Sequence, residues 1–380
     1  MTGREKIASA FSIEGAPEIA AVVPYEDLYI RDNWARLTSL PWWRRADPGI
    51  ERQLEWRRDV RKYMRHDWFP VPGFRSADER KTLRIDPRDD GVFLVDTRTG
   101  REKRMEPPRI GGWGSSGEVA SFRPANPPAA REDIDRLIPV SPRVEARDIQ
   151  WHGSDDLAKA ILAGYGGDLY PISQVSSPLW SCYGLWGFEG MMTMIVENPD
   201  LVGYASKRFL LNVAQQVQAA ASLGAEAIWI EECLIDHISP ESYRRLNVPV
   251  LSDLVAEIRA VGLKSIYYFC GNPAGKWDHI LSIGADALAL EEGKKGFTID
   301  IAEVVELVRG RCALFGNLDA IGVLQNGTEE QLRAEIARQI AAGRRNADRF
   351  IMSVGSPVTP GTPPERFRLY CDLAHEIGAL

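Results

Sequence analysis

The sequence predicts an α/β protein with a (β/α)8 TIM-barrel fold. From about residue 149 onward, short apolar segments alternate with long amphipathic segments, a pattern typical of a parallel sheet with short connections. Each apolar segment is almost continuously hydrophobic, as in strands that are buried on both faces. The chain has 380 residues, which is enough for one such barrel with an insertion.

Six of the eight barrel strands are expected in the second part of the chain, at residues 168–174, 225–232, 263–270, 285–292, 312–319 and 349–354. Residues 20–26 are the candidate for the first strand, and the second is hidden in a tryptophan-rich segment where no pattern gives its position. A doubly wound open sheet is the alternative arrangement. No GxGxxG segment or phosphate-binding loop supports that alternative.

Capping residues mark the helix boundaries between these strands. Asn198 and Ser239 each precede a proline, and Thr328 and Thr362 each begin a capping box. Four glycines are expected where helices end: Gly224, Gly262, Gly284 and Gly343.

The first part of the chain has a different composition, rich in tryptophan, arginine and proline. Residues 91–108 are typical of a β-hairpin, with Gly100 available for a positive φ in the turn. We expect residues 1–380 to form a single barrel domain. Residues 30–150 would then be an insertion that covers the barrel mouth like a lid, with the hairpin 91–108 near the mouth.

Charge and composition exclude several classes of protein. The formal net charge of −7 argues against a nucleic-acid-binding groove. No apolar run is long enough to span a membrane, and no leader segment opens the chain, so a cytoplasmic location is expected. The five cysteines are scattered without a CxxC pair, which does not suggest a disulfide framework.

The barrel rule selects the candidate site, because active sites of TIM barrels lie at the carboxyl ends of the strands. We expect six residues to face one central cavity: Glu231, Glu232, Cys270, Asn272, Glu291 and Asn317. Two further candidates follow the same strands, and two aromatic ones follow the strand at 168–174: His237, Asp319, Trp180 and Tyr183. Carboxylates that converge on one mouth should raise at least one pKa or bind a cation.

Less specific roles remain open for all of these residues. Strand-end carboxylates often cap a helix or pair with a basic residue, a buried cysteine is commonly inert, and aromatic residues commonly pack in a core. Alternate side chains of a strand face opposite ways, so only one of Glu231 and Glu232 can point into the barrel. The inward glutamate, partly desolvated, would suit a general acid, and Glu291 is the next catalytic candidate.

Five segments resemble the superfamily that contains uroporphyrinogen decarboxylase and the cobalamin-dependent methyltransferases. They are LWGFEGMMTMIVENPDLV (185–202), AEAIWIEECLIDHISPESYRRLNVPVL (225–251), YFCGNPAGKWDHILSIGADAL (268–288), LFGNLDA (314–320) and NGTEEQLRAEI (326–336). They occur in the same order and with similar spacing as in the superfamily, over more than half of the chain. The resemblance implies the barrel fold and an enzyme.

In the methyltransferase branch, the resemblance implies a zinc ion that activates a thiol, held by a His-x-Cys pair after the fifth strand and a cysteine after the eighth. Here Tyr268 takes the histidine position, Cys270 is retained, and Val354 falls near the second cysteine. Phenol is a poor zinc ligand at neutral pH and valine has no donor atom, so the usual ligand set is incomplete. Cys270 and His237 with a glutamate remain candidates for a divergent site.

In the decarboxylase branch, the resemblance implies an early arginine-rich motif and a central aspartate. Neither is found, and Arg31 is only a substitute that would bind a substrate carboxylate. A third branch moves a methyl group from a small methylated substrate to a corrinoid protein, and it is our leading interpretation. The 380 residues leave no room for a cobalamin domain, so the corrinoid is expected on a partner protein.

Three alternatives stay open: a cofactor-free decarboxylase or lyase acting on a small carboxylated substrate, a divergent metal-dependent hydrolase or transferase, and a non-catalytic binding protein. The sequence also leaves open whether the chain forms a homodimer. Substrate contacts are expected from nine residues: Arg31, Trp180, Tyr183, His237, Tyr268, Cys270, Asn272, Asn317 and Asp319.

Overall fold

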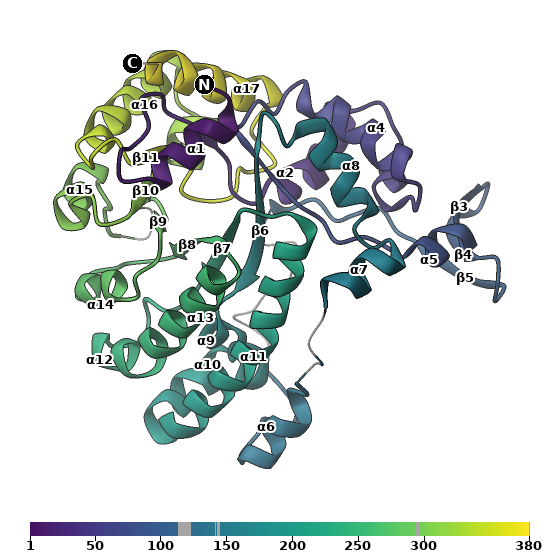
Figure 1. Ribbon diagram of the computed structural model, residues 1–380, viewed down its shortest axis with the longest axis horizontal. Helices are drawn as coiled ribbons and strands as arrows, with labels where there is room; N and C mark the ends of the chain where they lie inside the picture. The colour runs from purple at the N-terminus through teal and green to yellow at the C-terminus, as the bar shows by residue number, and fades with distance from the viewer. Residues whose placement is uncertain (113–122, 141, 143–144, 294–295, 380) are drawn as a thin grey trace.

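The fold is a nearly closed barrel of eight parallel strands surrounded by helices (Figure 1). The computed structural model describes residues 1–112, 123–140, 142, 145–293 and 296–379. The strands follow the order β1-β11-β10-β9-β8-β7-β6-β2 around the barrel. Their bounds are β1 Ala21–Val22, β2 Trp68–Pro70, β6 Tyr170–Ser176, β7 Ala227–Glu232, β8 Lys264–Phe269, β9 Ala287–Leu290, β10 Ala313–Phe315 and β11 Phe350–Ser353. The predicted barrel is confirmed, and β2 fills the position that the sequence left open.

Contacts between β1 and β2 bring the two ends of the sheet together. The Asp67 amide donates to the Ala21 carbonyl at 2.8 Å, and the Ala21 amide donates to the Asp67 carboxylate at 2.7 Å. The Trp68 indole donates to the Val23 carbonyl at 3.1 Å. These bonds satisfy polar groups that an open sheet edge would expose.

Large aromatic side chains fill the interior of the barrel. Trp229 of β7 lies at its centre, with ring centroids 5.6 Å from Trp68, 5.0 Å from Tyr268 and 6.0 Å from Phe315. Small alanines on β9 and β10 share this interior cluster and leave room for the rings. The barrel centre is therefore a packed core, and only the strand ends are available for a site.

Helices form the layer outside the strands. Their bounds in the first half are α1 Gly3–Phe11, α2 Glu26–Asp32, α3 Trp34–Leu37, η1 Trp42–Ala46, α4 Ile50–Arg61, α5 Ala77–Thr82, α6 Arg131–Leu137, α7 Ala146–His152 and α8 Asp156–Tyr165. In the second half they are α9 Pro178–Ser181, α10 Tyr183–Glu197, α11 Pro199–Leu223, α12 Pro240–Ser242, η3 Tyr243–Asn247, α13 Val248–Ala260, α14 Trp277–Ser282, α15 Ile301–Val308, η4 Ala320–Gln325, α16 Glu329–Arg344 and α17 Pro364–Gly378. None of the helices in the described ranges combines the length and hydrophobicity that a membrane span requires.

Most of the predicted helix boundaries are confirmed. Asn198, Ser239 and Thr328 cap their helices through side-chain oxygens. The capping box predicted at Thr362 is wrong, because α17 begins after Pro363 and the Thr362 hydroxyl bonds Thr359 instead. Gly343 was expected where a helix ends, and α16 ends at the next residue, Arg344.

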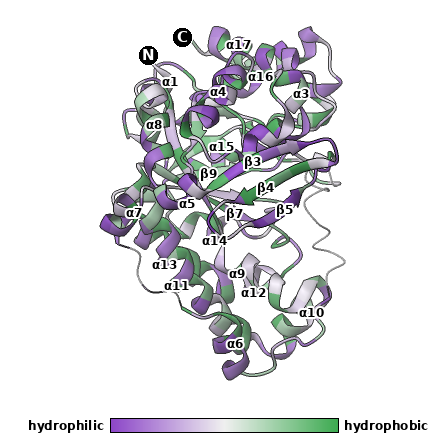
Figure 2. Ribbon diagram, turned by 90° about the vertical axis from the view of Figure 1, so that its right-hand side faces the viewer, coloured by the Kyte–Doolittle hydropathy of each residue, from purple (hydrophilic) through white to green (hydrophobic). Residues whose placement is uncertain are grey.

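The first part of the chain adds helices α2 to α5 and a small antiparallel sheet, β3 Leu83–Arg88, β4 Gly91–Asp96 and β5 Arg101–Met105. The predicted hairpin is confirmed as β4 and β5, with Gly100 at φ 68°, but β3 was missed. This sheet projects from the side of the molecule in Figure 1, and Figure 2 shows an apolar β4 beside a polar β5. The role of residues 30–150 as a lid stays a prediction, and residues 113–122, 141, 143 and 144 lie outside the described residues.

Candidate active site

Glu231 is the strand-end carboxylate that points into the barrel. It follows Ala227 and Trp229 on the inner face of β7, and its side chain is 4% exposed. Gln174 of β6 donates its amide to one carboxylate oxygen of Glu231 at 3.0 Å. Burial raises the pKa of Glu231 to about 7, although hydrogen bonds from Gln174 and Tyr25 act in the opposite direction.

Glu232 lies on the other face of the same strand. It accepts hydrogen bonds from the Ser177 hydroxyl at 2.6 Å, the Asn247 amide at 2.7 Å and the Tyr267 hydroxyl at 3.4 Å. Burial also raises the pKa of Glu232 to about 7. The expectation that both glutamates face one cavity is therefore wrong for Glu232, because alternation along the strand turns it toward the helix layer.

A row of acids and thiols crosses the mouth from β7 to β9. The Cys233 thiol lies beside Glu231 and donates to the Glu231 carboxylate at 3.8 Å. The Cys270 thiol, which follows β8, donates to Glu291, which follows β9, at 3.3 Å. A hydrogen bond with Cys270, together with burial, raises the pKa of Cys233. Glu231, Cys270 and Glu291 thus lie along one mouth, as the strand-end rule predicts.

Three predicted polar residues bind backbone groups of the segments that follow the strands. The Asn272 side-chain oxygen accepts from the Ala274 amide at 3.0 Å. The Asn317 amide donates to the carbonyls of Ile299 at 2.9 Å and Glu291 at 3.3 Å. Asp319 caps η4 by accepting two backbone amides, each at 2.9 Å. These contacts hold the loops at the mouth, and direct substrate contacts by the three residues stay predictions.

Two predicted tyrosines lie in or near the mouth, and the hydroxyl of each donates a hydrogen bond to a backbone carbonyl. The Tyr268 hydroxyl donates to the Gly355 carbonyl at 2.9 Å, and Tyr268 is buried. The Tyr183 hydroxyl donates to the Leu234 carbonyl at 2.9 Å, and its ring is buried. Both side chains therefore also have packing roles, which the sequence left open.

The remaining predicted residues are less closely tied to Glu231. Arg31 donates to the adjacent Asp32 at 2.8 Å and to the Gly112 carbonyl at 2.7 Å. Trp180 is partly buried against the main core. His237 is about half exposed, and its ring lies 5.4 Å from that of Phe188. Their substrate contacts stay predictions.

The donor atoms do not fit the zinc arrangement that the superfamily implies. The Tyr268 oxygen is occupied by the Gly355 carbonyl, and the buried Val354 side chain has no donor atom. Within the described ranges, no group of three or more His, Cys, Asp or Glu side chains is placed to hold a metal ion. We therefore derive no step of the chemistry through zinc.

Three residues of this site were missed from the sequence: Tyr25, Gln174 and Cys233. Gln174 ends the predicted strand 168–174 on the same face as Tyr170, and Cys233 stands two residues after Glu231. The period of two along a strand was the signal that would have selected both. Tyr25 follows β1 in a left-handed conformation at φ 58°, and its place near the end of the predicted strand 20–26 was the signal for it.

The sequence and the fold of this chain are similar to those of known proteins. The family model for uroporphyrinogen decarboxylase matches residues 119–377. A uroporphyrinogen decarboxylase from Janthinobacterium sp. (strain Marseille) is 25% identical over 209 residues, covering 52% of this chain and 56% of that protein. One from Neisseria meningitidis serogroup C is 26% identical over 205 residues, with the same two coverages. The chain therefore spans a little over half the length of these relatives.

A solved structure, described as a methyltransferase from Methanosarcina mazei, shares the architecture over 99% of both chains with a TM-score of 0.65. The two sequences are 15% identical, so this similarity concerns the fold.

Proposed function

Because the chain belongs to the uroporphyrinogen decarboxylase family, we propose that it is an enzyme in which Glu231 is the general acid for a one-carbon transfer. The transferred group is a methyl group, which leaves a small methoxy or methylamine-like substrate for a corrinoid carried by a partner protein. One observation supports this proposal above all. Glu231 points into the barrel mouth, and its pKa is about 7.

A pKa near 7 suits a general acid, because the carboxyl is substantially protonated at neutral pH and is still acidic enough to release its proton. In the proposed step, the bond between the methyl carbon and the substrate oxygen or nitrogen breaks. The methyl group passes to the corrinoid, and the leaving oxygen or nitrogen receives the proton of Glu231. Gln174 holds the carboxyl in place through a 3.0 Å hydrogen bond.

The walls around Glu231 also favour a small organic substrate. Tyr25, Trp229 and Tyr268 are packed edge to face or stacked beside it, with ring centroids 5.0–6.0 Å apart. Small-molecule sites are commonly lined by apolar and aromatic side chains with a few polar groups. The same walls exclude water, and this desolvation keeps the pKa of Glu231 high.

Decarboxylation is a second candidate, favoured by the family match to uroporphyrinogen decarboxylases. In that reaction the carbon that loses carbon dioxide takes up a proton, which Glu231 is equally placed to donate. The two reactions differ in their products, because one methylates a corrinoid and the other releases carbon dioxide.

The test is a substrate screen followed by two matched variants. Small methoxy compounds and methylamines are each incubated with the protein and free cob(I)alamin, and methylation is followed by the absorbance of the corrinoid. Glu231→Gln keeps the shape and removes the acid, so turnover should fall roughly 10²- to 10⁴-fold. Glu232→Gln is the control, because Glu232 faces the helix layer, and its turnover should change little.

Carbon dioxide release from a carboxylated substrate, without corrinoid methylation, would show that the protein catalyses decarboxylation and not methyl transfer. Full activity of Glu231→Gln on an identified substrate would contradict the role of Glu231 in both.

A further inference from the structure

A cavity lies between helices α2, α4 and α8 and strands β2 and β6. Its volume is about 270 Å³, near the lower end of the range for small-molecule sites. Its apolar wall includes Trp56, Val60, Phe69, Ile161 and Tyr165. The wall is hydrophobic enough to hold the carbon skeleton of a small ligand.

Two arginines of one helix also line this cavity. Arg57 and Arg61 are four residues apart on α4, so they lie on the same side of the helix. Arg57 donates to the Gln53 side chain at 2.8 Å, and its guanidinium lies 4.0 Å from the centroid of the Trp56 ring. Arg61 donates through Nη2 to the His66 carbonyl at 2.9 Å. Its other terminal nitrogen, Nη1, is buried and has no hydrogen-bond partner among the residues that the structure describes.

Neither arginine is neutralised by an ion pair with a described carboxylate, and both residues are partly buried. Burial lowers the pKa of Arg57 to about 10 and also lowers the pKa of Arg61. Both side chains stay charged at neutral pH. A buried charge without a charged partner destabilises the fold, and a bound anion would offset that effect.

The acids around the cavity leave one positive charge uncompensated. Asp27 lines the cavity but pairs with Arg45 at 2.9 Å. Glu26 lines it as well and bonds the His66 ring, and burial lowers the pKa of His66, which keeps the ring neutral at pH 7. The two guanidiniums of Arg57 and Arg61 therefore face one carboxylate, that of Glu26, whose partner among the described residues is the neutral His66 ring.

We propose that this cavity is a binding site for a small organic monocarboxylate. The carboxylate accepts from Nη1 of Arg61 and compensates the excess charge, and the apolar part of the ligand packs against Trp56, Phe69 and Tyr165. The planar guanidinium matches a carboxylate in shape as well as in charge. The cavity borders the candidate active site at one residue, since Gln174 lines the cavity and also bonds Glu231.

The test measures binding alone, with the full-length protein and no enzymatic reaction. Benzoate and 3-phenylpropionate are titrated by calorimetry, and benzamide serves as the uncharged match for benzoate. At least one of the two acids should bind saturably and raise the unfolding temperature, whereas benzamide should not. Arg61→Met keeps the length of the apolar stem and removes the charge, so affinity should fall about 10- to 100-fold.

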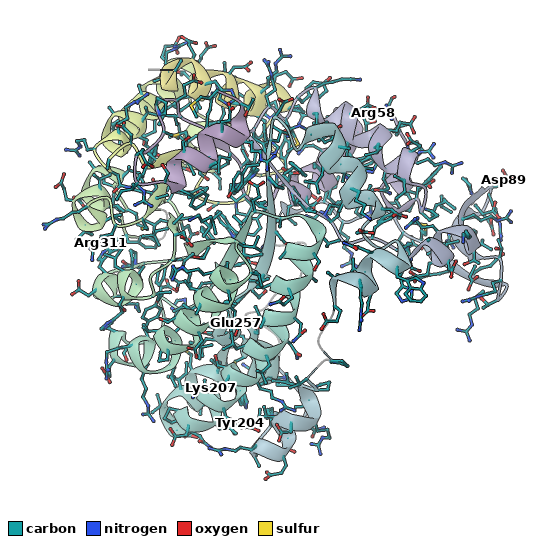
Figure 3. The ribbon with its side chains drawn as sticks, viewed as in Figure 1. Arg58, Asp89, Tyr204, Lys207, Glu257 and Arg311 are labelled. Atoms are coloured by element: carbon teal, nitrogen blue, oxygen red, sulfur yellow. The ribbon has the colours of Figure 1, made fainter. Side chains whose placement is uncertain are left out.

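Arg58→Ala is the matched control, since Arg58 belongs to the same helix but its side chain is 61% exposed and points away from the body of the molecule (Figure 3). This variant should bind the acid as the wild type does. Circular dichroism checks that both variants are folded, and Arg61→Met should fold well because it removes an unpaired buried charge.

Three results would overturn the proposal: no saturable binding of either acid, equal affinity in wild type and Arg61→Met, or equal binding of benzamide and benzoate. Inorganic phosphate is titrated as well. If phosphate binds at Arg61 as tightly as the acids do, the cavity is an inorganic anion site and the assignment to carboxylates is wrong.

Discussion

Glutamine at position 232 removes a buried carboxyl whose pKa rises from 4.5 to about 7 on folding. Because burial raises the pKa, the folded protein binds this proton more tightly than the unfolded chain does. The carboxyl thus contributes stability that is complete below its unfolded pKa and is lost as the pH rises through about 7. At about 1.4 kcal/mol for each pH unit, the difference between the two pKa values corresponds to about 3 kcal/mol.

Urea unfolding of the wild type and Glu232→Gln between about pH 4 and about pH 8 measures this effect. The difference between the two proteins isolates position 232, because His66, whose pKa is lowered by burial, changes stability in the opposite direction in both. Between these limits the variant should gain about 3 kcal/mol in free energy of unfolding relative to the wild type. A difference that stays constant over the range would show that burial does not perturb Glu232, and the same reasoning for Glu231 would fail.

Two further predictions concern metal binding and packing. Dialysis against a chelator should leave activity unchanged, because the donors near Cys270 do not form a zinc ligand set; one zinc per chain that disappears in Cys270→Ala would contradict this. Gly343→Ala should cost about 1–3 kcal/mol in thermal unfolding, because its new Cβ would overlap the ring of the buried Phe350. Gly164→Ala, in the exposed and open part of α8, should instead stabilise by up to about 1 kcal/mol, and equal effects of the two substitutions would refute the packing argument.

The barrel was predictable because its longer strands are apolar on both faces and are separated by well-capped helices. Strand β2 was not, since it has three residues and ends at Pro70. Strand β3 was missed because Leu83–Arg88 mixes polar residues with a proline, which sequence rules allow only at a sheet edge. Gly343 was expected only as a marker of a helix end, and it is also needed for space against Phe350, which no sequence pattern shows.

The candidate site was predictable as a set of strand ends but not in its orientation. Strand Ala227–Glu232 is buried on both faces, so no polar face shows whether Glu231 or Glu232 points inward. The tertiary packing of Trp229 in the barrel interior decides it. The cavity on α4 was not predictable, because Arg57, Arg58 and Arg61 look alike in the sequence and only the fold separates the exposed one from the other two.

The most direct measurement for the proposed chemistry is the titration of the Glu231 carboxyl itself. Protein labelled with ¹³C at the glutamate carboxyl carbon is followed by NMR across the pH range, and Glu231→Gln identifies the signal. The structure predicts a midpoint at about 7, raised by burial on the inner face of β7. A midpoint near the ordinary glutamate value of about 4.3 would show an ionised carboxylate at neutral pH, and Glu231 would then not be the proton donor.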